Sequence, residues 1–327
     1  MLVLSGKPVI VFYHAFCWDG LGAAYIVKRS IGDCTCIPIN YGKHSITSLR
    51  DLVGSVCKKA LVDSDIIFVD FCLPYDLMVA LNNLTSGKMF VLDHHLTQYP
   101  ILKKLSEETS VQVFYDSHES GTSLAAIVFN GGRMEPLFKY IKDRDLWNFN
   151  YEETQSVNAF ISEYSRKDVS VIDQLLNIPI EEMVEKGNLL LKYKNSLVDE
   201  LSSKAVKIKL LGIEILYVMC IAAIASDVGN AMAEVSPSKT SVCVYNIKGG
   251  ISLSFRSIGV DCTPLAKHFG GGGHAQACGA SVDLDTLNLI LSGRLGEGDI
   301  VLNKLPIAVG GSSDRVTIGD FKNAKAF

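Results

Sequence analysis

An acid and two adjacent histidines, Asp93-His94-His95, follow directly after the apolar run Met89-Phe90-Val91-Leu92. Imidazole and carboxylate groups are common metal ligands in proteins. In an open α/β sheet, ligands bind outside the carboxyl ends of the strands, which is where this run stops. Taken alone, the triplet is also typical of a turn with two surface histidines. Residues elsewhere in the chain are needed to distinguish this interpretation from a metal site.

Two upstream runs end in the same way. Residues 9–13 (VIVFY) finish at His14, and residues 66–69 (IIFV) finish at Asp70. Helix-like segments separate the three runs, as expected for parallel strands joined by crossover helices. We therefore predict an α/β domain with a parallel sheet and flanking helices, in which His14, Asp70 and the Asp93-His94-His95 triplet share one crevice.

Composition narrows the class of protein. The chain has 327 residues, enough for two domains, with 48% hydrophobic and 20% charged residues, as in ordinary globular proteins. A net charge of -4 gives no polybasic signature, which disfavours long duplex DNA as a partner. The nine cysteines show no zinc-like pairing, and no signal segment is apparent, so we expect a reduced, cytoplasmic protein without a membrane span.

Domain boundaries follow from the change in pattern along the chain. A long amphipathic helix is predicted from Ile180 to about Lys204, and β-like pieces follow at 213–218, 241–247 and 251–256. We predict a metal-binding domain over 1–180, a connecting helix over 181–205, and a smaller α/β substrate-binding domain with a C-terminal tail over 206–327.

Four consecutive glycines precede His274. Ordering them costs much conformational entropy, so they form either a flexible link or a place where backbone amides approach a ligand closely. The flanking apolar residues favour an ordered loop. We predict that the amides of Gly271, Gly272 and Gly273 hold an anion, with Arg256 and His274 adding charge-assisted contacts to phosphate.

Together these motifs resemble those of the DHH phosphoesterases that carry a DHH-associated C-terminal domain, a group that includes nanoRNases, oligoribonucleotide phosphodiesterases and RecJ-like exonucleases. The resemblance covers most of the chain, from about Val9 to Val282. It is carried by His14 with Asp19-Gly20, Asp70, the triplet, a candidate fourth acid at Asp143, and Arg256 with the GGGGH segment. The triplet together with the downstream glycine run is specific, whereas either alone is weak.

The resemblance implies two manganese ions in the N-terminal domain, with Mg²⁺ or Co²⁺ as alternatives, and a C-terminal domain that closes over the substrate. It assigns Asp70 as the ligand that bridges both metals, His14 to one metal, and His94 with Asp143 to the other. It also implies that His95 orients the substrate phosphate and that Asp93 anchors the loop. Two such ions can activate a hydroxide for in-line attack on phosphorus. From pattern alone, however, the favoured interpretation of Asp143 and Asp145 is a surface salt-bridge cluster around Arg144.

One position departs from the family pattern. The first motif of the family usually holds two acids, and here Cys17 occupies one of those positions, with Asp19 two residues later. Thiolate binds softer ions than carboxylate does. Three interpretations remain: a thiolate ligand, a site with weaker occupancy of one metal, or a small core cysteine.

We therefore predict a metal-dependent phosphodiesterase that hydrolyses short single-stranded oligonucleotides or dinucleotides to nucleoside monophosphates. A phosphatase of nucleoside bisphosphates or polyphosphate is an alternative from the same chemistry. A catalytically impaired nucleic-acid-binding protein is the alternative that Cys17 suggests. The prediction includes no membrane partner and allows a homodimer.

Overall fold

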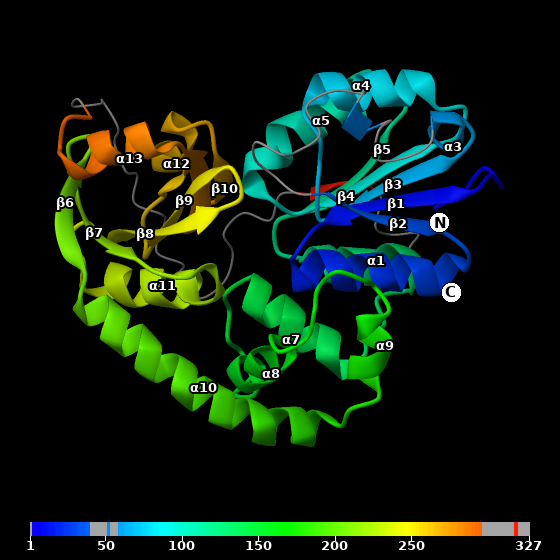
Figure 1. The fold of residues 1–327 in the computed structure, drawn as a ribbon. Helices are drawn as coiled ribbons and strands as arrows, with labels where there is room; N and C mark the ends of the chain where they lie inside the picture. The colour runs from blue at the N-terminus through cyan, green and yellow to red at the C-terminus, as the bar shows by residue number, and fades with distance from the viewer. Residues whose placement is uncertain (1, 40–50, 53–57, 296–316, 320–327) are drawn as a thin grey trace. The chain divides into compact units, whose positions relative to one another are not determined.

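The computed structural model describes residues 2–39, 51–52, 58–295 and 317–319. The chain divides into two compact units, one formed by Met1–Leu191 with Asp314–Phe327 and the other by Lys192–Ser313 (Figure 1). None of the described helices combines the length and the hydrophobicity needed to cross a membrane.

The first unit alternates strands and helices, as the apolar runs predict. Its described elements are β1 (Val9–His14), α1 (Trp18–Ile31), β2 (Thr35–Ile39), α3 (Lys58–Val62), β3 (Asp65–Val69), α4 (Tyr75–Leu84), β4 (Met89–Asp93), η1 (Leu96–Gln98), α5 (Tyr99–Glu108), β5 (Gln112–Asp116), α6 (Gly121–Phe129), α7 (Pro136–Asp145), α8 (Thr154–Ile161) and α9 (Val171–Leu176). The three strands expected to carry polar residues at their ends are all present.

The sheet of this unit has the strand order β12-β5-β4-β3-β1-β2. All of its pairs are parallel except that of β5 with the short strand β12 (Thr317–Ile318), which is antiparallel. The predicted parallel α/β sheet is thus confirmed. Because β2 lies on one side of β1 and β3 on the other, the chain changes direction between β1 and β3, and such a switch point opens a crevice at the carboxyl ends of these strands.

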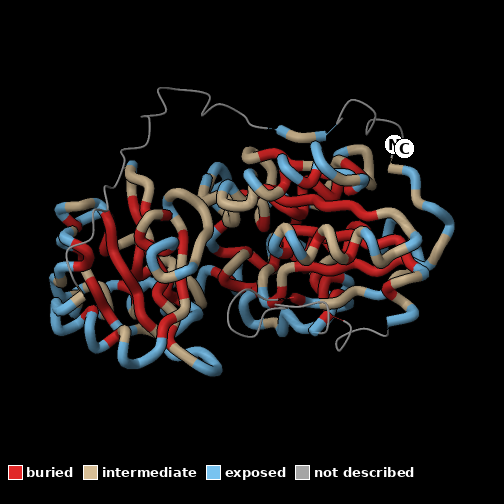
Figure 2. Tube along the Cα trace, turned by 90° about the horizontal axis from the view of Figure 1, so that it is seen from above, coloured by how far each residue is buried: buried red, intermediate tan, exposed pale blue. Residues whose placement is uncertain are grey.

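Both faces of the sheet are covered, which explains why the strands are apolar throughout rather than alternating. Alternate strand residues pack into two separate cores, one against α1, α6 and α7, and the other against α4 and α5. Figure 2 shows the buried strands as a continuous layer inside this unit. Only their polar terminal residues are left to line the crevice.

Helix α10 (Ile180–Ser203) runs from the first unit into the second, close to the predicted helix from Ile180 to about Lys204. The boundary between the two compact units falls within this helix, between Leu191 and Lys192, so the helix contributes to both. Strand β12 pairs with Tyr115 and Asp116 of β5, so Thr317 and Ile318 belong to the sheet of the first unit; the rest of the predicted tail from 296 onward, apart from Gly319, lies outside the described residues.

The second unit is a smaller α/β domain. Its described elements are β6 (Val206–Leu210), β7 (Ile213–Met219), η2 (Ala222–Ile224), α11 (Ala225–Val235), β8 (Thr240–Ile247), β9 (Gly250–Ser257), α12 (Thr263–His268), β10 (Gly272–His274), β11 (Ala277–Val282) and α13 (Leu284–Leu291). The strands form a sheet in the order β10-β11-β9-β8-β7-β6, in which only β7 and β8 are parallel. This confirms the predicted second α/β region.

Candidate metal centre

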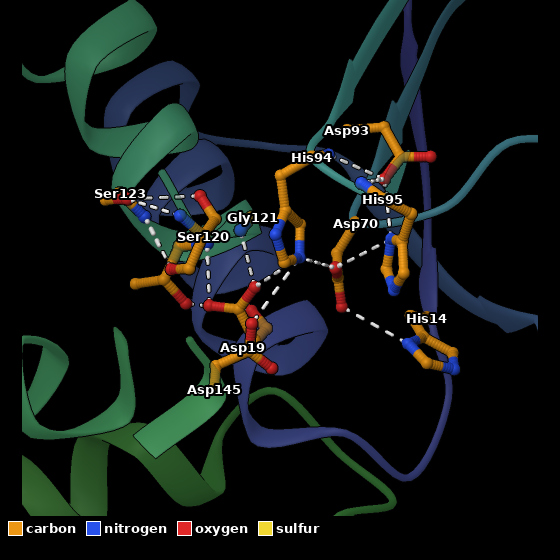
Figure 3. A network of polar contacts seen from close by, with 11 residues as sticks. His14, Asp19, Asp70, Asp93, His94, His95, Ser120, Gly121, Ser123 and Asp145 are labelled. Atoms are coloured by element: carbon orange, nitrogen blue, oxygen red, sulfur yellow. Dashed lines mark hydrogen bonds and ion pairs between the residues drawn. The ribbon is translucent and has the colours of Figure 1, made fainter. Parts of the chain in front are cut away.

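The polar residues predicted at strand ends lie together at the switch point of the first sheet (Figure 3). His14 is the last residue of β1, Asp70 follows β3, and Asp93 ends β4. Because β1, β3 and β4 are adjacent and parallel, their carboxyl ends meet at one edge of the sheet. These residues therefore lie close together, as the sequence predicts.

Asp70 stands between two histidines. Its Oδ2 lies 3.3 Å from His14 Nδ1, and its Oδ1 lies 3.1 Å from His94 Nε2. The side chain is buried, and the backbone φ is 55°, a left-handed conformation that is uncommon outside glycine. Such a conformation costs free energy and persists only where the surroundings enforce it. It turns a carboxylate at the strand end so that its two oxygens face different partners.

Three groups of potential ligand atoms lie at or beside this carboxylate. His14, Cys17 and Asp70 form one group, Asp19, His94 and Asp145 form a second, and Asp70, Asp93 and His95 form a third; within each group the ligand atoms lie within 4.8 Å of one another. Asp70 Oδ1 contacts His94 of the second group as well. The geometry thus matches one shared carboxylate with a set of nitrogen, oxygen and sulfur donors on either side.

Cys17 is at the N-cap of α1, where its side chain makes no capping hydrogen bond. It is half-buried, and burial together with the nearby Asp70, Asp145 and Asp19 carboxylates raises the pKa of its thiol well above the usual value. Of the three interpretations of this residue, the core cysteine is the one that the geometry contradicts. The sulfur faces the polar crevice and is absent from the described apolar cores.

Asp19 is held by the first turn of α6. Its Oδ2 accepts a hydrogen bond from the Gly121 amide (2.5 Å) and its Oδ1 accepts one from the Thr122 amide (3.0 Å), while Oδ2 also lies 3.7 Å from His94 Nε2. Amides at a helix N-terminus have no intrahelical acceptor and favour negative charge. The polar run Ser120 to Ser123 signals this helix start in the sequence, but its partnership with Asp19, about a hundred residues away, could not be predicted from it.

The acid of α7 that lies beside His94 is Asp145, whereas the predicted ligand was Asp143. Asp145 ends α7 and its Oδ2 lies 3.5 Å from His94 Nε2. The Asp143 carboxylate is used elsewhere, because it accepts hydrogen bonds from the amides of Asn150 (2.9 Å) and Tyr151 (3.3 Å) and from Thr154 Oγ1 (2.5 Å). Asp143 thus organises the turn after α7, and its carboxylate belongs to none of the groups of potential ligand atoms found among the described residues.

A helical signal could have distinguished the two acids. Phe138 and Ile141 are buried on the inner side of α7. Asp145 follows them at spacings of seven and four residues and continues that stripe. Asp143 falls outside the stripe, and a turn formed beyond the helix end accounts for its burial.

Asp93 and His95 form a separate pair beside the shared carboxylate. Asp93 Oδ1 accepts the amide hydrogens of His94 (2.7 Å) and His95 (3.1 Å), and it lies 2.7 Å from His95 Nδ1. His95 Nδ1 is also 3.8 Å from Asp70 Oδ1. The contacts of Asp93 fix both the loop and the imidazole orientation, which agrees with the anchoring role that the resemblance implies for Asp93.

Charge is unbalanced in this crevice. Burial raises the pKa of Asp19, and the Asp70 carboxylate adds to the shift; burial and Asp19 hold the pKa of Asp145 well above its usual range. Burial also opposes the charge on Asp70, but hydrogen bonds with His14 and His94 outweigh it and keep the Asp70 pKa well below its usual range. Burial lowers the His94 pKa, yet contacts with Asp70 and Asp145 outweigh that effect and raise it to about 10. The charged forms of Asp19 and Asp145 are therefore unfavourable in this crevice, and a bound cation would stabilise them.

These residues fit divalent cations. Carboxylate oxygens and imidazoles converge on the same space, and a divalent ion would relieve the repulsion that raises the carboxylate pKa values. One oxygen, Asp145 Oδ2, is buried and accepts no hydrogen bond from the described residues. Buried polar atoms are nearly always satisfied in folded proteins, so an atom left in this state indicates a ligand or ion.

Comparison with known families supplies the remaining observation. Residues 214–292 match the DHHA1 domain family. The match falls on the second unit, downstream of the Asp93-His94-His95 triplet. The second unit therefore carries a DHHA1 domain.

The following similar proteins are distant in sequence. An uncharacterized protein of Acanthamoeba polyphaga mimivirus is 24% identical over 83% of the chain, and the chain spans 66% of that relative's length. Similar solved structures include the pGpG-specific phosphodiesterase PggH of Vibrio cholerae (13% identity, 88% of this chain and 98% of that one, TM-score 0.45). They also include RecJ of Thermus thermophilus in complex with Mn²⁺ (15% identity, 88% of this chain and 51% of that one, TM-score 0.47).

Within the DHHA1 domain, Arg256 lies on β9 and is anchored by its own unit. Its guanidinium donates to Ser226 Oγ on α11 (2.6 Å), to Ser254 Oγ (3.2 Å) and to the Phe255 carbonyl (2.7 Å). Its Nε atom is buried without a hydrogen-bond partner among the described residues. The side chain is therefore held rigidly, and contact with phosphate stays a prediction.

The glycine run of the DHHA1 domain is ordered, although in a different form from the predicted loop. Gly272–His274 is strand β10, paired antiparallel with β11. A Cβ at Gly271 would lie 2.0 Å from the Gly279 carbonyl oxygen, and Gly273 has a φ of 136°. Close packing against β11 accounts for glycine at both positions. Anion binding by their amides is a separate role that this packing neither requires nor tests.

Proposed function

We propose that this protein is a divalent-metal-dependent phosphodiesterase that hydrolyses short oligonucleotides or dinucleotides to nucleoside monophosphates. The observation that carries the proposal is the carboxylate of Asp70, whose two oxygens face one donor group each. A shared carboxylate between two sets of donors is the arrangement that paired divalent ions use in phosphoryl hydrolysis.

Bound divalent ions, with Mn²⁺ as the first expectation, would neutralise phosphate charge and lower the pKa of a water molecule in the crevice. His14 and Cys17 would hold one ion, Asp19, His94 and Asp145 the other, and Asp70 would bind both. The backbone amides of α6 keep Asp19 in place without adding a competing side chain.

His95 is the residue that we assign to the substrate phosphate. Its Nδ1 faces Asp93, which fixes the ring orientation and favours the tautomer with the proton on Nδ1. A fixed imidazole beside the shared carboxylate can position a phosphate oxygen for in-line attack. The DHHA1 domain, through Arg256 and the Gly271 to His274 strand, is the candidate for gripping the rest of a short nucleotide chain. The net charge of -4 agrees with a short substrate rather than a long duplex.

The test compares Asp70→Asn with Asp116→Asn. Asp116 is a matched control because it is also a buried aspartate at the end of a strand, yet it belongs to neither donor group. The wild-type protein, stripped with chelator and reloaded with Mn²⁺, is assayed on a dinucleotide, a 20-mer, a nucleoside 3′,5′-bisphosphate and polyphosphate, with metal content measured in parallel.

We expect the wild type to release mononucleotides from the dinucleotide faster than from the 20-mer. Asp70→Asn should lose both bound metal and turnover by at least about a hundredfold, whereas Asp116→Asn should keep both. Preferential release of inorganic phosphate from the bisphosphate or polyphosphate would show that the protein is a phosphatase rather than a phosphodiesterase. Binding of oligonucleotide without turnover under any divalent ion would instead favour a binding protein.

A further inference from the structure

The two donor groups at Asp70 differ in chemistry. The group of Asp19, His94 and Asp145 offers two oxygens and one nitrogen, whereas the group of His14, Cys17 and Asp70 offers one nitrogen, one sulfur and one oxygen. Carboxylate oxygens suit harder ions such as Mn²⁺ and Mg²⁺, and thiolate suits softer ions such as Zn²⁺. The two halves of the centre should therefore not prefer the same ion.

The surroundings of Cys17 differ from those of the buried cysteines. Cys72, Cys243, Cys262 and Cys278 are buried and belong to apolar cores. Cys17 is half-buried, and its sulfur lies within 4.8 Å of ligand atoms of His14 and Asp70. It also occupies the N-cap of α1 in an extended conformation (φ −110°, ψ 136°), and the Gly20 amide is a backbone hydrogen-bond partner that lowers the pKa of the thiol, although burial and the nearby carboxylates outweigh this effect.

We propose that Cys17 makes this a mixed-ion centre, in which the group of His14, Cys17 and Asp70 selects a soft divalent ion of the Zn²⁺ class and the group of Asp19, His94 and Asp145 selects Mn²⁺. The inference rests on the metal centre proposed above, though not on its substrate. When the ion binds, the Cys17 thiol would lose its proton to solvent and bind as thiolate, with no oxidation or reduction.

Cobalt is the probe, because thiolate ligation to Co²⁺ gives a charge-transfer absorption band in the near ultraviolet that oxygen and nitrogen ligands do not give. Metal-free wild type, Cys17→Ser and Cys17→Asp are titrated with Co²⁺. The dissociation constants for Zn²⁺ and Mn²⁺ are measured by calorimetry on the same samples, without substrate. Zn²⁺ generally binds mixed protein donors more tightly than Mn²⁺, so the quantity compared between variants is the ratio of the two constants.

One half-buried pair of thiols away from the centre requires a control. Cys34 and Cys36 are half-buried with their sulfurs 3.8 Å apart, so they could bind soft ions themselves. The double variant Cys34→Ser/Cys36→Ser removes that pair, and neither residue belongs to a donor group of the centre. Thermal melting of each metal-free variant shows whether it is folded before metal is added.

We expect the cobalt band in the wild type and in Cys34→Ser/Cys36→Ser, and its loss in both Cys17 variants. Cys17→Ser should weaken Zn²⁺ binding by at least about tenfold, since even residues behind a ligand contribute 10- to 100-fold. Cys17→Asp should lower the preference for Zn²⁺ over Mn²⁺ and remain folded. This variant keeps the test decisive if Cys17→Ser is unstable.

Two outcomes would overturn the inference. Binding of Co²⁺ to the wild type without the band would exclude thiolate ligation while leaving a metal centre in place. A band that survives in Cys17→Ser and disappears in Cys34→Ser/Cys36→Ser would assign the soft site to the other thiols. A Cys17-dependent band in a protein that turns over no oligonucleotide would support the mixed-ion centre and contradict only the proposed function.

Discussion

At the scale of single residues, Asp143 and Asp145 show how neighbouring acids on one helix take different roles. Asp143 accepts three hydrogen bonds from the turn after α7, whereas Asp145 faces His94. We expect Asp145→Ala to lose the ion of its donor group and at least about a hundredfold in turnover, with little loss of thermal stability. Asp143→Ala should keep both metals but destabilise the fold by about 1–3 kcal/mol, because two backbone amides and the buried Thr154 hydroxyl lose their acceptor.

Metal content and thermal melting of the two variants separate these roles. Loss of metal from Asp143→Ala, with Asp145→Ala fully loaded, would restore the assignment that the sequence suggested. The sequence pattern identified the helix that carries the acid, but the choice of Asp143 over Asp145 came from the resemblance to the family. The deciding contact, to the amides of Asn150 and Tyr151, depends on a turn whose conformation is not encoded in the helical pattern.

At the scale of elements, the start of α6 is packed against the metal centre. A Cβ placed on Gly121 would lie 2.5 Å from Asp70 Cβ and 2.9 Å from Asp19 Oδ2. We therefore expect Gly121→Ala to displace both carboxylates, with at least about tenfold weaker metal binding. Ser123→Ala is the control, because it removes the capping-box contact with Ser120 at a cost of about 0.5–2 kcal/mol while leaving the amides that hold Asp19.

Calorimetric metal titration and melting curves on both variants test this. If Gly121→Ala bound metal as tightly as Ser123→Ala does, the α6 N-terminus would have only a structural role. Glycine at 121 could be read from the sequence as part of a helix start, but its contact with Asp70 joins residues far apart in the chain, and no local pattern reports such a contact.

The elements themselves were largely predictable. The strands that end at His14 and near Asp70 and Asp93, and the helix from Ile180, agree with the predicted runs to within a few residues. This succeeded because strands buried on both faces read as continuous apolar runs. The glycine run was less predictable, since Gly271 and Gly273 are required by contact with β11, a neighbour that the local sequence does not identify.

At the scale of the whole molecule, the chain separates chemistry from substrate binding if the proposed function holds. The residues proposed above to bind the two ions lie in the first unit, and Arg256 with His274 lies in the DHHA1 domain. A dinucleotide offers a scissile phosphate and a second nucleotide to grip, whereas a small ester such as bis(p-nitrophenyl) phosphate offers only the former. Variants of the DHHA1 domain should therefore discriminate between these substrates.

We predict that Arg256→Ala and His274→Ala each raise the KM for a dinucleotide by about one to two decades, since a contact to a charged group contributes roughly 1.5–3 kcal/mol. Both should keep their metals and hydrolyse the small ester almost normally. Arg256→Lys is the matched variant. It retains the charge but cannot reproduce the fork of hydrogen bonds to Ser226, Ser254 and Phe255, so an intermediate loss would show that geometry as well as charge matters.

Kinetics on both substrates, metal analysis and melting curves are measured together, because loosening of the DHHA1 domain would lower the melting temperature. Equal losses on the dinucleotide and the small ester, or loss of metal from either alanine variant, would place these residues in the catalytic machinery instead.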